Sequence, residues 1–173
     1  MLVKIIAAIA IIAACGKIGF DFAGKLARRE RELQGLILRL NLLETEITFR
    51  STPLGDALVC VANGTRGAER DIFIKCGNAL NKKMGITAGD AWREAVKESR
   101  PSLAMTDEDI AIIESLAPGF GGSDAENQMT NIKLVKKRLE DALKAAGEQS
   151  AKLAKMYRSA GVLVGIFIVV MFI

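Results

Sequence analysis

The sequence has no histidine and only one tryptophan and one tyrosine among its 173 residues. Without histidine, the chain cannot build a Ser-His-Asp triad, a Cys–His pair or a His-ligated zinc or iron site. The three cysteines, Cys15, Cys60 and Cys76, form no Cys-x-x-Cys motif. A Cys60–Cys76 disulfide is one interpretation, and two reduced, buried thiols are the one we favour. The composition thus excludes these histidine-based sites and shows no zinc or redox motif, and we expect a protein that is not an enzyme and holds no cofactor or metal.

The basic residues are concentrated near the two ends of the chain. Met1–Arg31 carries six basic and two acidic residues, and Lys144–Ile173 carries four basic residues and one acidic residue. These ends together contribute +7 to the net charge of +4, which leaves −3 for Glu32–Leu143. A nucleic-acid-binding domain gathers its basic residues on a reading face. Here they flank apolar segments, so we expect no nucleic-acid partner.

Two uncharged, apolar segments predict membrane attachment. The residues between Lys4 and Lys17 and the residues of Ala160–Ile173 would each form a helix about 20 Å long. This is shorter than a hydrocarbon core of about 30 Å, but flanking Lys and Arg side chains can extend to the headgroups. We therefore predict transmembrane helices at 1–22 and 159–173, with a domain at 23–158 between them. Two buried helices of a soluble protein are the alternative.

Charge near the apolar segments predicts the orientation. Lys17–Arg31 contains five basic residues and Lys144–Arg158 contains four, whereas the far sides carry only Lys4. The positive-inside rule then places the central domain in the cytoplasm. An alternative is an exported lipoprotein, because Ile12–Gly16 fits a lipobox in which Cys15 would be lipidated. In the C-terminal segment, Gly161 and Gly165 form a GxxxG motif that predicts packing against another membrane helix.

The central region shows the signals of an all-α domain. Apolar residues recur every three or four positions between Leu33 and Ile47, which predicts a first helix from the apolar start to about Arg50. Ser51-Thr52-Pro53 then ends that helix and opens a second one, with Ser or Thr as the cap and Pro53 in the first turn. Asn63-Gly64 closes the second helix, with the glycine in the left-handed conformation.

Four further helices follow from caps and breakers. The third covers Ala68–Met84, and a fourth begins at Thr87 and ends before Pro101. A fifth begins at the acidic run after Thr106 and ends at Pro118-Gly119. The last begins at a Ser123–Glu126 capping box and continues without a break into the C-terminal segment. The prediction is a six-helix antiparallel bundle whose first and last helices extend into the transmembrane segments.

The candidate functional residues are polar side chains near the predicted helix ends. Glu44 and Glu46 lie about 200° apart on a helix, so the two carboxylates cannot serve one site on that helix alone. We expect Glu44 to bond to a neighbouring helix end, at the Thr52 or Ser123 cap, and Glu46 to be solvated. A divalent-cation site with Asp56 or Asp124 is the alternative. The full set of partner-binding or structural candidates is Glu44, Glu46, Thr52, Pro53, Asp124 and Gln128.

Three segments in register resemble the stage III sporulation protein AB family of endospore-forming bacteria. They are LETEITFRSTPLGDAL (43–58), GGSDAENQ (121–128) and KMYRSAGVLVGIFIVVMFI (155–173). That family is related to the F/PilC-type platform proteins of type II secretion and type IV pilus systems, which have a six-helix cytoplasmic domain.

The resemblance implies a non-enzymatic platform in the channel between mother cell and forespore. The protein would lie in the mother-cell membrane facing the forespore, with its central domain in the cytoplasm. The implied partners are the secretion-type ATPase encoded with it, sporulation protein AA, and the other membrane subunits of the channel. The resemblance implies no catalytic residue, no cofactor and no small-molecule substrate.

Overall fold

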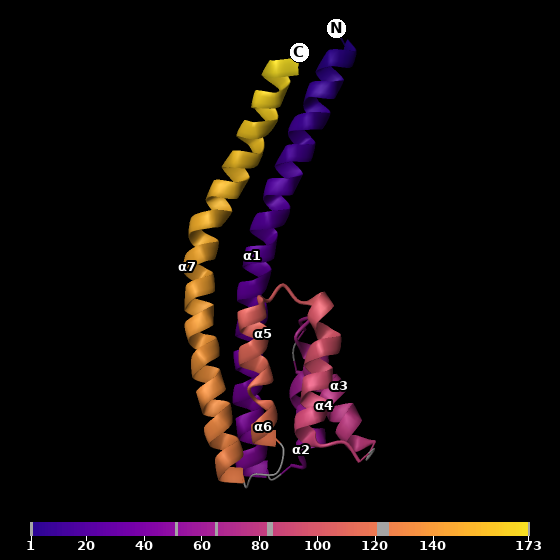
Figure 1. Cartoon of the computed structure of the whole chain (residues 1–173), viewed down its shortest axis with the longest axis vertical. Coiled ribbons are helices and arrows are strands. Elements are labelled where there is room, and N and C mark those ends of the chain that lie inside the picture. The colour runs from indigo at the N-terminus through magenta and orange to yellow at the C-terminus, as the bar shows by residue number, and fades with distance from the viewer. Residues whose placement is uncertain (1, 51, 65, 83–84, 121–124, 173) are drawn as a thin grey trace. The chain divides into compact units, whose positions relative to one another are not determined.

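The computed structural model describes the backbone of residues 2–50, 52–64, 66–82, 85–120 and 125–172. Side chains are described in the same ranges except at 2–12, 15, 125–126, 154–155, 157–158, 161–162 and 165–172. The regular elements in these ranges are all helices, with no strand, which confirms the all-α prediction (Figure 1). The elements are α1 (Leu2–Arg50), α2 (Leu54–Asn63), α3 (Arg70–Asn81), α4 (Ala88–Ser99), η1 (Arg100–Ser102), α5 (Asp107–Glu114), α6 (Ala117–Phe120) and α7 (Ala125–Phe172).

The chain divides into two compact units. Unit 1 comprises Met1–Glu30 with Ala145–Ile173, and unit 2 comprises Arg31–Lys144. The two long helices, α1 and α7, each contribute residues to both units. The continuity of α7 confirms that Gly147 does not break the last helix.

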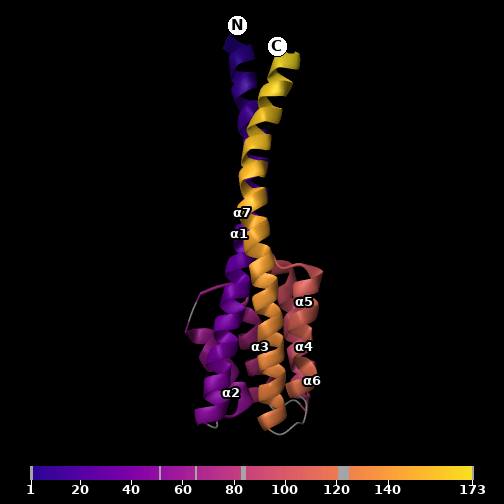
Figure 2. The same cartoon turned by 90° about the vertical axis from the view of Figure 1, so that its left-hand side faces the viewer.

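In unit 2, parts of α1 and α7 lie side by side and the shorter helices pack around them (Figure 2). The apolar stripe of α1 is buried as the periodicity predicts: Leu33, Leu36, Leu40 and Leu43 are each at most 1 % exposed. Burying a leucine of this kind stabilises the fold by about 1.5–3 kcal/mol. The stripe thus fixes which face of α1 packs into the bundle.

Trp92 of α4 joins the elements on the other side of the core. Its indole is fully buried and its Nε1–H donates to the carbonyl oxygen of Ile113 at 2.8 Å. Phe73 and Phe120 meet the indole edge-to-face, with centroids 5.4 and 5.2 Å away. Gly89 allows α4 to approach α6 closely, because a Cβ there would lie 2.6 Å from a backbone oxygen of α6.

Unit 1 consists of the N-terminal part of α1 and the C-terminal part of α7. On α1 the residues Gly16, Gly19 and Ala23 are buried, and Arg29 Nη1 donates to Gln149 Oε1 of α7 at 3.3 Å. No helix among the described residues has an apolar stretch long enough to cross a bilayer. The transmembrane helices predicted at 1–22 and 159–173 are therefore not shown by the structure.

The helix caps that depend on local sequence are as predicted. Thr87 accepts a hydrogen bond from the Asp90 backbone N–H and caps α4. Thr106 and Asp109 form a reciprocal capping box at the start of α5. The predicted Ser123–Glu126 capping box lies outside the described residues.

Other helix ends differ from the prediction. Gly64 has φ −74°, so the left-handed end predicted for α2 is wrong. Pro53 is the N-cap residue of α2 rather than part of its first turn. Pro118 and Gly119 lie within the one-turn helix α6 instead of ending α5, which stops at Glu114. The third helix is shorter than predicted and spans Arg70–Asn81.

Candidate partner-binding site

Glu44 and Glu46 face different neighbours of α1, as their spacing on the helix requires. Glu44 faces α7, where Lys136 Nζ lies 3.2 Å from Oε2 and Lys133 Nζ lies 3.8 Å from Oε1. Lys136 also donates to Asn41 Oδ1 at 2.8 Å. The expected bond from Glu44 to the Thr52 cap is wrong, because the Thr52 hydroxyl bonds to Glu46 instead. The alternative bond to Ser123 lies outside the described residues.

Glu46 takes the role that we expected of Glu44. Its side chain is only 13 % exposed, and its Oε2 accepts from the Thr52 hydroxyl at 3.2 Å. Arg50 Nη1 donates to Oε1 at 3.0 Å, and Cys60 Sγ lies 4.0 Å from the same atom. The prediction of a solvated Glu46 is thus wrong: this carboxylate joins the end of α1 to the start of α2.

Thr52 consequently does not cap α2. Its hydroxyl is bonded to Glu46, and no side chain among the described residues caps α2. Pro53 contributes through its backbone, since its carbonyl oxygen accepts from the Ala57 N–H at 2.9 Å. The tertiary contact has replaced the local cap that the sequence predicts.

The remaining candidates have different outcomes. Gln128 of α7 is half-buried and has an interaction partner. Asp124 lies outside the described residues. Gly161 and Gly165 lie within α7, but their surroundings are outside what the structure describes. The helix packing predicted from the GxxxG motif therefore stays a prediction.

The arrangement of carboxylates does not resemble a metal site. In the parts of the chain that the structure covers, no three His, Cys, Asp or Glu side chains are close enough to hold an ion. Asp56, the suggested third ligand, accepts from Asn81 Nδ2 at 2.9 Å. The cation-site alternative through Glu44, Glu46 and Asp56 is therefore wrong.

Cys60 and Cys76 are not joined in a disulfide. Cys60 is exposed and Cys76 is buried, and both are free thiols. Burial raises the pKa of the Cys76 thiol to about 12, because a thiolate would lose its hydration there. The preference for reduced thiols is confirmed, whereas the expected burial of Cys60 is wrong.

Sequence reasoning missed a buried ion pair between Arg39 of α1 and Glu69 next to α3. The side chains are 0 % and 3 % exposed, and Arg39 Nη1 lies 2.7 Å from Glu69 Oε1. The same nitrogen donates to the Gly35 carbonyl oxygen at 3.1 Å. Any Cβ at Gly35 or Gly67 would overlap the Glu69 carboxylate. The sequence did carry one signal of this burial: Arg39 directly precedes Leu40, which belongs to the apolar stripe of α1.

The fold and the site define a class of protein: an all-helical domain in which long terminal helices contribute to the core and charged side chains connect helices. Residues 4–173 match the model of the family described as stage III sporulation protein AB, and the chain belongs to this family.

A similar protein is stage III sporulation protein AB of Bacillus subtilis (strain 168). It is 26 % identical over 170 residues, covering 98 % of this chain and 99 % of that protein. A solved structure of a stage III sporulation protein AB (SpoIIIAB) superposes with a TM-score of 0.67 at 24 % identity, covering 71 % of this chain and 96 % of that one. The latter likeness supports the fold.

Proposed function

We propose that this chain is a non-enzymatic membrane scaffold of a channel complex between mother cell and forespore. In this proposal, 1–22 and 159–173 anchor the protein in the mother-cell membrane facing the forespore, and the domain at 23–158 lies in the cytoplasm. There it docks a sporulation protein AA-like ATPase and other stage III channel subunits. Membership of a sporulation family supports the process, and the residues of unit 1 support the attachment.

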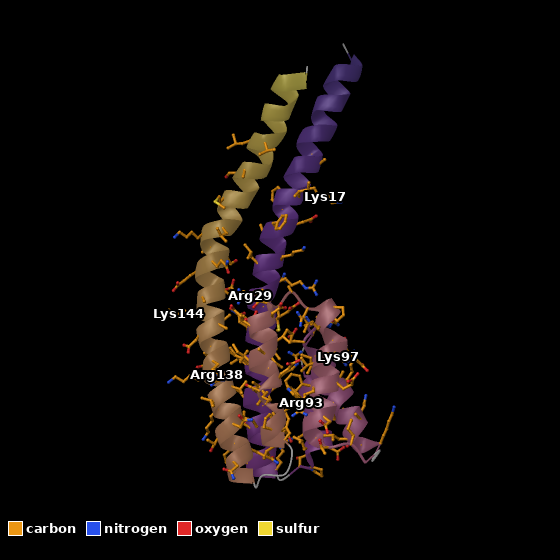
Figure 3. The ribbon with its side chains drawn as sticks, in the orientation of Figure 1. Lys17, Arg29, Arg93, Lys97, Arg138 and Lys144 are labelled. Carbon is orange, nitrogen blue, oxygen red and sulfur yellow. The ribbon has the colours of Figure 1, made fainter. Side chains whose placement is uncertain are left out.

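The observation that carries this proposal is the apolar surface of unit 1. Six large apolar side chains there are 50–64 % exposed in the chain alone: Ile18, Phe20, Phe22, Met156, Leu163 and Val164. Exposed apolar residues that gather in this way indicate a membrane or protein interface. Lys25 Nζ lies 5.6 Å from the centre of the Phe22 ring, so cations stand next to this surface. Lys17 and Arg29 belong to the same half of α1 (Figure 3).

Apolar side chains beside lysine and arginine match the boundary between hydrocarbon and headgroups. Unit 1 contains eight basic and three acidic residues, an excess of +5 that favours an anionic cytoplasmic leaflet. In unit 2, by contrast, Glu44, Glu46 and Glu69 each face cations of the bundle itself. This use of charge suits a scaffold whose surface is recognised by other subunits.

Cys60 tests the orientation, because its thiol is exposed on the bundle and Cys76 is buried. An impermeant maleimide should label Cys60 only after sporulating cells are permeabilised, and a Cys60→Ser variant assigns the label. Labelling of Cys60 in intact cells would instead support an exported lipoprotein and contradict the proposal.

Two further measurements address anchoring and docking. The full-length chain should stay in the membrane pellet after alkaline carbonate extraction, and its release would exclude anchoring by the two ends. The tagged chain, solubilised from sporulating cells, should co-purify with the ATPase and the channel subunits. Recovery of the chain without them would contradict the scaffold role.

A further inference from the structure

A pocket of about 100 Å³ lies between α3 and α4 in unit 2. The two helices pack against each other (Figure 1), and Lys75 Nζ of α3 lies 3.3 Å from Glu98 Oε2 near the end of α4. Both of these side chains line the pocket, and so does Ile86 in the connection between the helices. The pocket therefore follows the groove between α3 and α4 from this ion pair toward the connection.

Small and apolar side chains form most of the lining. Ala91 and Ala95, on successive turns of α4, are 2 and 3 % exposed, and Ala79 lines the pocket from α3. Ile86 adds a large apolar side chain that is 40 % exposed. It follows Gly85, whose φ of 70° is a left-handed conformation that glycine adopts readily. The alanines keep the groove open, and Ile86 gives it an apolar wall.

Three charged side chains also line the pocket: Lys75, Glu94 and Glu98. Lys75 is already paired with Glu98. Glu94, by contrast, has no hydrogen bond or ion pair with any residue that the structure describes. One lysine and two glutamates give the lining a net charge of −1. The Glu94 carboxylate supplies this charge, so the pocket favours a cation.

The volume limits what the pocket can hold. Pockets for small molecules and cofactors measure about 300–1,000 Å³, several times more than this one. A space of about 100 Å³ suits a single side chain. Lysine places its methylene stem along apolar surface and keeps a compact ammonium at the hydrated edge. Arginine gains most from stacking on an aromatic ring, and none of the described lining residues is aromatic.

We propose that this pocket receives one lysine side chain of a partner protein. The methylene stem lies against Ala79, Ala91 and Ala95, and the ammonium pairs with Glu94. This inference rests on the proposed scaffold function and names a docking position for it. Because Glu94 is exposed, its ion pair with the lysine fixes the partner and its register more than it raises affinity.

Other occupants match the lining less well. An acidic side chain would place a second carboxylate beside Glu94, and like charges across an interface are unfavourable. An apolar side chain would fill the alanine-lined space but would cover a carboxylate without giving it a cation, which costs free energy. Lysine matches both the apolar lining and the unpaired charge.

Carbodiimide crosslinking in membranes of sporulating cells tests the ion pair directly. The reagent joins a carboxylate to an amine in contact with it: an amide bond forms, and the carbodiimide takes up the water released. In the full-length chain, peptide mapping should find Glu94 joined to a lysine of another protein. Glu114, an exposed carboxylate of α5 outside the pocket, is the matched control and should give no such product.

Three results of this experiment would overturn the inference. The first is the absence of any product at Glu94. The second is a product in which Glu94 is joined only to a lysine of its own chain or of a second copy. The third is the same partner lysine joined to Glu114 as to Glu94, because contact would then not depend on the pocket.

Variants of the pocket test its charge and its space by co-purification. Glu94→Gln should lower the recovery of one channel subunit by about twofold to fivefold, as expected for a partly exposed ion pair. Glu94→Lys should lower it at least about tenfold, because two ammonium groups would meet. Ala79→Leu fills the groove and should lower recovery as well. Glu114→Lys and Ala111→Leu on α5 are the matched controls and should leave recovery unchanged.

The same measurement separates this inference from the scaffold role. If Glu94→Lys and Ala79→Leu recover every subunit as the wild-type chain does, the pocket is not a docking site and the scaffold role stands. If the wild-type chain recovers no subunit, the proposed function and this inference fail together. The melting temperature of each variant verifies that the bundle is folded.

Discussion

Replacing Glu69 by glutamine removes the carboxylate that lies 2.7 Å from Arg39 Nη1 inside unit 2. Glutamine has nearly the same shape, so it fits the space that Gly35 and Gly67 leave for the carboxylate. Its amide offers one acceptor oxygen but no charge. The variant therefore isolates the electrostatic contribution of a buried pair.

Breaking a buried ion pair by removing one partner costs about 3–5 kcal/mol, since the remaining buried charge loses the opposite charge beside it. For a chain of this size each kcal/mol lowers the melting temperature by about 2–4 °C, so we expect a loss of roughly 6–20 °C. Lys75 and Glu98 provide the matched control. Their side chains are 38 and 53 % exposed, and Glu98→Gln should cost less than about 1 kcal/mol because solvent screens that pair.

A double-mutant cycle gives the sharper result. Arg39→Met with Glu69→Leu removes both charges and keeps the space filled, and such replacements are often close to neutral. Urea unfolding of the full-length protein, followed by circular dichroism, should give the double variant a stability within about 2 kcal/mol of wild type. The two single changes should couple by more than about 2 kcal/mol. Additive costs, or a Glu69→Gln variant as stable as the Glu98→Gln control, would refute this account.

Three further predictions concern the core and the thiols. Trp92→Phe should cost about 1–3 kcal/mol in urea unfolding, because it removes the hydrogen bond from Nε1 and leaves a small void. Gly89→Ala should cost about 1–3 kcal/mol, since its Cβ would lie 2.6 Å from a backbone oxygen, whereas Gly24→Ala, with nothing within 4 Å, should not destabilise. At pH 8.5, iodoacetamide should modify Cys60 long before Cys76, as peptide mapping would show; equal rates would exclude burial of Cys76. Burial raises the pKa of the Cys76 thiol from an ordinary value of 9.0 to about 12, so between these pH values the unfolded chain loses this proton while the folded chain keeps it. The free energy of unfolding should therefore fall as pH rises through this range.

Features that depend on neighbours in the sequence could be predicted. The apolar period gave the buried face of α1, and the caps at Thr87 and Thr106 lie where local hydrogen bonds place them. A helix without a breaker, such as the one that includes Gly147, also follows from local preferences. These elements form because residues within one or two turns already favour them.

Features that depend on tertiary contacts could not be predicted. Thr52 carries the right group for a cap, but its hydroxyl bonds to Glu46 and does not cap α2. Arg39 and Glu69 are thirty positions apart, and each alone resembles an ordinary surface charge. Only the assembled bundle shows that Gly35 and Gly67 make room for that pair.

The faces of α1 in unit 2 differ in what they contribute to stability. Leu43 is fully buried, whereas its neighbour Leu42, about 100° further round the helix, is 38 % exposed. Polar substitutions at exposed positions usually change stability by less than about 0.5 kcal/mol, so folding does not require leucine at position 42 or phenylalanine at position 49.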